Sequence, residues 1–182
     1  MLTDQDKELL IEHHSLSLPE SIEQETYLDF LYALKKFRAA NPTEELHLYC
    51  RSGGGDTRSA MAMVDLIQSD GKVVGHLVGD VCSSAAAIWA ACPKRIVYPN
   101  GMLFVHPVSW NDIVGVVDAS RLWSMWQEFN ETDWKYCNIY ASASNKDKVW
   151  WHNQLNPAGD GSWFDAKTLI EMEMGQWPTK AE

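Results

Sequence analysis

The chain has 182 residues, of which 46% are hydrophobic and 22% are charged, and its formal net charge is -10. This composition is ordinary for a globular protein, and the length is enough for a sizeable core. The acidic balance argues against a nucleic acid partner, because phosphate binding needs a basic surface. We therefore expect one domain, residues 1–182, that binds no nucleic acid.

The four cysteines are scattered along the chain without a C-x-x-C pair: Cys50, Cys82, Cys92 and Cys137. Their spacing fits neither a zinc site nor a disulfide framework, so the sequence suggests no metal and no cofactor. Buried free thiols are the default in a reducing cytoplasm. The N-terminus is acidic where a signal peptide is basic, and no apolar run approaches the roughly 20 residues of a membrane span. We expect a cytoplasmic protein without a membrane partner.

The hydrophobic pattern predicts alternating strands and helices as far as residue 105. The predicted strands are residues 8–17, 46–50, 73–78, 96–98 and 102–105, and the predicted helices are residues 22–38, 57–69 and 83–92. This order indicates an α/β fold with a mainly parallel sheet. A ligand site would then lie at the carboxyl ends of the strands, where Gly55, Ser83 and His106 fall.

Residues 117–150 are predicted to be helical and are unusually rich in aromatic side chains. These aromatics are either ordinary core or an oligomer interface, where Trp, Tyr and Phe are enriched. The residues concerned are Trp123, Trp126, Phe129, Trp134, Tyr136 and Tyr140.

A serine at the start of the small-residue helix is the candidate nucleophile. Ser83 follows a strand and a glycine turn, and the helix dipole favours negative charge there. His106, at the end of the next apolar strand, is the candidate base. Ser84 is the rival nucleophile, but its backbone N–H is the natural second oxyanion donor beside that of Gly55. The structural alternative is that Ser83 only caps the helix and His106 is a hydrogen-bonded structural residue.

These segments together resemble the proteolytic subunit of the Clp protease, the ClpP family (peptidase S14), and its phage-type relatives. Residues 52–55 match the family's S-P-G-G loosely, with Gly53 in place of proline. Residues 79–83 match the turn that carries the nucleophile, and residues 98–106 match the L-P-N-S-x-x-M-I-H segment. The resemblance covers residues 46–108 well and residues 163–176 weakly. It implies a ClpP/crotonase-like fold with βα repeats, a head of residues 1–110 and 155–182, and a projecting helical handle of residues 115–152.

The resemblance also implies a catalytic triad, in which an aspartate orients the histidine. The family's aspartate stands five residues before an alanine that opens the last helix. Here that alanine is Ala166, and the matching position is Gly161. Asp160 is one position away and is the predicted third member. Another acid, Asn156 or no third member are the alternatives, and Asp165 is predicted to be the helix N-cap.

The resulting prediction is an ATP-dependent serine endopeptidase that cleaves unfolded polypeptides, with Ser83, His106 and Asp160 as the triad. Family resemblance implies a homo-oligomer, a heptameric ring that can stack as a 14-mer or mix with a paralogue, and an ATP-dependent Clp unfoldase as partner. The family's N-terminal segment contacts the unfoldase, and little sequence precedes the first predicted strand here. The alternatives are a catalytically inactive ring subunit and a crotonase-type acyl-CoA enzyme.

Overall fold

A computed structural model of the chain describes residues 8–10, 12–109, 117–155 and 159–179. Its strands are β1 Ser15–Ser17, β2 Leu46–Ser52, β3 Val73–Cys82, β4 Lys94–Val97, β5 Met102–Val105 and β6 Ser162–Asp165. Its helices are α2 Gln24–Ala40, α3 Thr57–Asp70, α4 Ser84–Ala90, α5 Ala119–Ser142, α6 Lys148–Leu155 and α7 Ala166–Glu171. The predicted α/β class is confirmed.

The strands within the described residues form one six-stranded sheet in the order β1-β2-β3-β5-β6, with β4 also paired to β3. Every pairing is parallel except that of β5 with β6. The long strand β3 has two partners, because its first half pairs with β4 and its last residues pair with β5. This branching places the end of β3 beside the end of β5.

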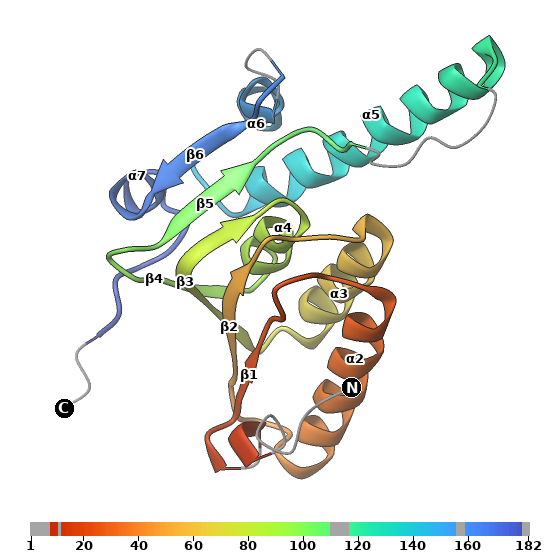
Figure 1. Cartoon of the computed structure of the whole chain (residues 1–182). Helices are drawn as coiled ribbons and strands as arrows, with labels where there is room; N and C mark the ends of the chain where they lie inside the picture. Colours follow the sequence, from red (N-terminus) through yellow and green to blue (C-terminus); the bar gives the residue numbers. More distant parts are fainter. Residues whose placement is uncertain (1–7, 11, 110–116, 156–158, 180–182) are drawn as a thin grey trace.

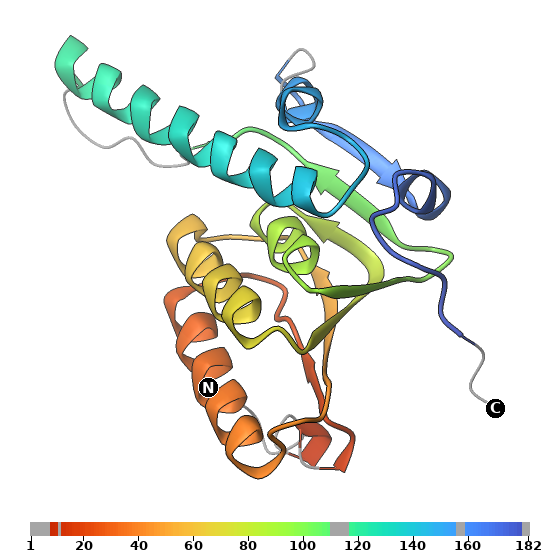
Figure 2. The same cartoon turned by 180° about the vertical axis from the view of Figure 1, so that it is seen from behind.

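Helices α2, α3 and α4 cover one face of the sheet (Figures 1 and 2). Strand β2 shows the matching alternation, since every second side chain is buried from Leu46 to Ser52. Helix α4 lies deepest: all seven of its residues are buried, among them Trp89 with no exposed surface. Its alanines allow this close approach of the helix to the sheet.

The predicted helical region is two helices, α5 and α6, separated by a turn. Helix α5 projects beyond the sheet (Figure 1), and its aromatic residues divide along its length. Tyr136 and Tyr140 are buried in the core, whereas Trp123 and Trp126 are more than half exposed. The division of the chain into a head and a handle stays a prediction.

Near the ends of the chain one prediction was wrong and one strand was missed. Residues 8–10 are helical rather than part of a strand, and the strand is confined to β1. Strand β6 was not predicted at all. It is four residues long and forms by antiparallel pairing with β5, a tertiary contact that leaves no clear local signal.

Candidate active site

Ser83 occupies a strained turn between β3 and α4. Its backbone has φ 57° and ψ −130°, a combination that residues with a side chain adopt rarely. Its N–H donates to the carbonyl oxygen of Phe104 on β5 at 2.9 Å, which fixes the turn to the neighbouring strand. Its side chain makes no N-cap hydrogen bond to the helix. The hydroxyl is therefore not used as a helix cap.

Ser84, the rival nucleophile, is 1% exposed. Its hydroxyl donates to the carbonyl oxygen of Gly55 at 3.2 Å. As the first residue of α4 it has a backbone N–H without a partner inside the helix. The structure thus directs the Ser84 side chain into the protein and leaves Ser83, which is partly exposed, at the surface of the turn.

The glycine loop lies directly against this turn. A Cβ on Gly54 would be 2.7 Å from the Cβ of Ser83, and Gly54 and Gly55 have positive φ angles of 89° and 148°. Ile22 holds the loop by donating to Gly54 O at 2.8 Å and accepting from the Asp56 N–H at 2.7 Å. Among the described residues no backbone carbonyl accepts from the N–H of Gly55, which leaves it available as an oxyanion donor.

His106 follows β5 directly, and its ring stacks on Phe104 with the centroids 5.4 Å apart. Its Nδ1 lies 2.7 Å from the carbonyl oxygen of Pro107. A carbonyl only accepts hydrogen bonds, so Nδ1 carries the proton and Nε2 of the neutral ring is free to accept one. This is the tautomer that a general base for a serine hydroxyl requires.

Ser83, His106 and the glycine loop line one cavity of about 1060 Å³. Its rim is charged: Arg58 and Glu128 form an exposed ion pair of 2.9 Å between α3 and α5. Asp56 caps α3 by accepting from the Ser59 N–H at 2.7 Å. The cavity is therefore polar and open, and both the candidate nucleophile and the candidate base line it.

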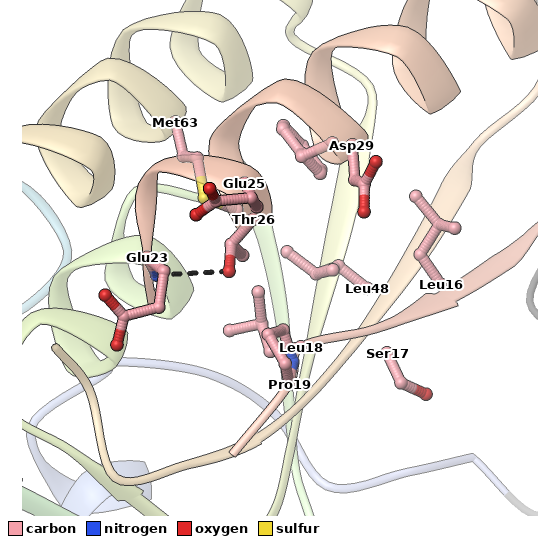
Figure 3. Close-up of a pocket in the computed structure, with 11 residues that line it drawn as sticks. Leu16, Ser17, Leu18, Pro19, Glu23, Glu25, Thr26, Asp29, Leu48 and Met63 are labelled. Carbon is pink, nitrogen blue, oxygen red and sulfur yellow. Dashed lines mark hydrogen bonds between the residues drawn. The ribbon is translucent and has the colours of Figure 1, made fainter. Parts of the chain in front are cut away.

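A second cavity, of about 380 Å³, lies between β1 and α2 (Figure 3). Its apolar lining includes Leu16, Leu48 and Met63, and its acidic side chains include Glu23 and Glu25. The second cavity meets the first at Glu23, which lines both. It contains none of the predicted catalytic residues.

Asp160 is exposed in the loop before β6, and no hydrogen bond or ion pair joins it to His106 in the part of the chain that is described. Gly161 is the residue packed there, since a Cβ on it would be 2.7 Å from the Cβ of His106. Asn156 lies outside the described residues. Asp165 caps α7 as predicted, accepting from the Thr168 N–H at 2.8 Å.

A buried carboxylate that the sequence reading missed lies near His106. Asp133 of α5 is 7% exposed and accepts from the Val108 N–H at 2.8 Å. Burial raises the pKa of Asp133, while the Val108 N–H, His152 and His106 act in the opposite direction. A sequence signal existed: Asp133 shares one helical face with Tyr136, Cys137 and Tyr140, and an acid on such an apolar face is unusual.

The Clp protease family model matches residues 3–155. The chain belongs to the Clp protease family. It is 28% identical, over 102 residues, to the ATP-dependent Clp protease proteolytic subunit 1 of Rhodopirellula baltica. That match covers 54% of this chain and 45% of the relative, so the chain matches less than half the length of that protein.

Among the described residues, no helix is both long and apolar enough to cross a membrane. No group of three or more His, Cys, Asp or Glu side chains there is arranged to hold a metal ion.

Proposed function

We propose that this chain is a Clp-type serine endopeptidase, with Ser83 as nucleophile and His106 as general base. The observation that carries the proposal is the shared cavity, in which the strained Ser83 turn, the His106 ring and the glycine loop meet. Membership of the Clp protease family supports the reaction class.

The chemistry follows from the positions of these groups. The Ser83 Oγ attacks the carbonyl carbon of a peptide bond while its proton passes to Nε2 of His106. The backbone N–H groups of Gly55 and Ser84 hold the oxyanion of the tetrahedral intermediate. His106 then returns the proton to the leaving amine, and water hydrolyses the resulting acyl-enzyme by the same steps in reverse order.

Asp160 remains the predicted third member of the triad, although its exposed position gives that role no structural support. The packing of Gly161 against His106 favours the second candidate, an inactive ring subunit. A crotonase-type acyl-CoA enzyme stays a third candidate because a glycine loop serves both chemistries. These alternatives make no use of Ser83 as a nucleophile, which is where a test separates them.

Assembly into a ring of identical subunits is part of the proposal. On the projecting part of α5, Leu122, Trp123 and Trp126 are each more than half exposed, which is costly for an isolated subunit. A heptameric ring, single or stacked, and an ATP-dependent unfoldase as partner follow from the family. Sedimentation over a range of concentrations tests the ring, and a monomer at every concentration would contradict it.

A cytoplasmic location completes the proposal. All four cysteines are free thiols, and Cys50, Cys92 and Cys137 are buried, as expected in a reducing compartment.

A fluorophosphonate probe tests the proposed nucleophile. The probe should label the wild-type chain at Ser83, and Ser83→Ala should abolish both the labelling and the cleavage of a fluorogenic peptide. Ser84→Ala is the matched control, since it removes a neighbouring hydroxyl and keeps the backbone N–H. Labelling at Ser84 would show that the assignment is wrong by one residue. No labelling of assembled wild-type protein would favour the inactive subunit or the acyl-CoA enzyme.

A further inference from the structure

The peptide unit between Pro107 and Val108 is hydrogen-bonded at both of its ends. Its carbonyl oxygen accepts from Nδ1 of His106 at 2.7 Å. Its N–H belongs to Val108 and donates to the Asp133 Oδ1 at 2.8 Å. A carboxylate and the catalytic imidazole are therefore joined through a single planar amide.

We propose that Asp133 is the acid of this site and acts on His106 through the amide group that joins Pro107 to Val108. The inference rests on the proposed function, since it assigns the third member of the same catalytic group. Asp133 is a positioning residue in this scheme, because it touches neither the substrate nor the reacting atoms.

The amide transmits the charge because its two polar ends are conjugated. A negative partner at the N–H increases the electron density on the carbonyl oxygen and makes it a stronger acceptor. The stronger acceptor holds the Nδ1 proton more firmly, so Nε2 stays free for the Ser83 proton. No proton crosses the amide: one proton moves from the Ser83 Oγ to Nε2, and the Nδ1 proton remains in place.

Burial strengthens the electrostatic effect of the Asp133 carboxylate on His106. Asp133 is 7% exposed, and interactions between charges are screened less there than in water. When His106 gains the Ser83 proton it becomes a cation, and the electrostatic attraction between the two side chains stabilises that cation directly. The same hydrogen bond ties the segment after His106 to helix α5, which sets the orientation of the ring.

The position that matches the family's aspartate, Gly161, has no room for an acidic side chain, and this strengthens the assignment of Asp133. Gly161 packs on His106 with φ 81°, so an acidic side chain at that position would need a strained backbone and the space that His106 occupies. Asp160 lies in an exposed loop. Asp133, by contrast, is buried and interacts electrostatically with His106.

Other titratable groups face Asp133 and must be separated from its effect. His152 of α6 interacts with it, and that ring stacks on Trp134 at 4.3 Å between centroids. Burial raises the pKa values of Tyr136 and Cys137, and the charge of Asp133 adds to both increases. Around the cavity itself the charged groups among the described residues are Glu23, Asp56, Arg58 and Glu128. A His152→Gln background removes the other imidazole that interacts with Asp133.

The decisive variant is Asp133→Asn in the full-length, assembled protein. The asparagine oxygen still accepts from the Val108 N–H, so the segment stays in place while the charge is lost. We expect kcat for a fluorogenic peptide to fall about tenfold or more with little change in KM. The acidic limb of the pH profile of kcat should shift to lower pH by about one unit. This shift corresponds to an approximately tenfold loss in the proton affinity of the His106 ring. Glu131→Gln, which removes an exposed charge from the same helix, should change neither.

Nitrogen NMR of the histidine rings, assigned with a His106→Gln variant, gives a test that needs no activity. The wild-type ring should carry its proton on Nδ1, and its titration midpoint should be lower in Asp133→Asn. A proton on Nε2, or an unchanged midpoint, would overturn the inference even in a chain that fluorophosphonate does not label. If fluorophosphonate does not label the chain but the NMR result is as expected, the proposed peptidase activity is refuted and the inferred effect of Asp133 on His106 is supported. Loss of rate in Asp160→Asn alone would return the role to Asp160.

Discussion

Replacement of Ser83 by glycine should stabilise the protein while abolishing its activity. The residue sits at φ 57° and ψ −130°, and a side-chain-bearing residue in such a region costs about 1–3 kcal/mol. Glycine removes that cost but gains freedom in the unfolded chain worth roughly 0.5–1 kcal/mol. The expected net gain is therefore about 1 kcal/mol relative to Ser83→Ala, which keeps the Cβ and lacks the hydroxyl in the same way.

Urea unfolding of the two variants, followed by tryptophan fluorescence, measures the difference. Both samples need the same protein concentration because assembly adds to the apparent stability. With a slope of about 2 kcal/mol per molar urea, the midpoint of Ser83→Gly should lie roughly 0.5 M above that of Ser83→Ala. An alanine variant as stable as the glycine variant, or more stable, would refute the claim that this turn stores strain.

Two further outcomes follow from the packing of particular side chains. Gly161→Asp should lower both stability and peptide cleavage rather than restore a family triad, because its Cβ would stand 2.7 Å from the Cβ of His106; a gain in kcat would contradict this. Burial, followed by the charges of His47 and Lys94, lowers the pKa of His76 to about 4. As the pH falls below about 6.5, His76 is therefore protonated in the unfolded chain but not yet in the folded chain. The free energy of unfolding should drop by about 2 kcal/mol between pH 7.5 and 5. His76→Phe should flatten this dependence and His13→Gln should not; equal slopes in urea unfolding would count against it.

The parts of the site that sequence reading predicted are those with a strong local signal. The glycine run before α3 and the small-residue helix α4 each adopt a particular backbone conformation, and their residue types indicate that conformation in the sequence. Ser83 and His106 follow strands directly, so the parallel order of the strands was enough to expect them at one edge of the sheet.

The third member of the site could not be found in this way. The hydrogen bond from Val108 to Asp133 joins residues 25 positions apart and exists only once α5 has packed beside the end of β5. The choice between Asp160 and Gly161 depended on the register of β6, and the antiparallel pairing of Val105 with Ser162 decides that register. Both facts belong to tertiary structure rather than to any local pattern.

Strand β5 is the element that gives the site its geometry. The pairing of Cys82 with Phe104 sets β3 and β5 in register, and the Phe104 carbonyl then holds the Ser83 turn. Two residues further along the same strand direction stands His106, whose ring stacks on Phe104. One residue, Phe104, thus fixes the backbone of the proposed nucleophile and packs on the ring of the proposed base. The distance between these two groups is therefore set by the sheet itself, and the loops that follow have only to orient the imidazole.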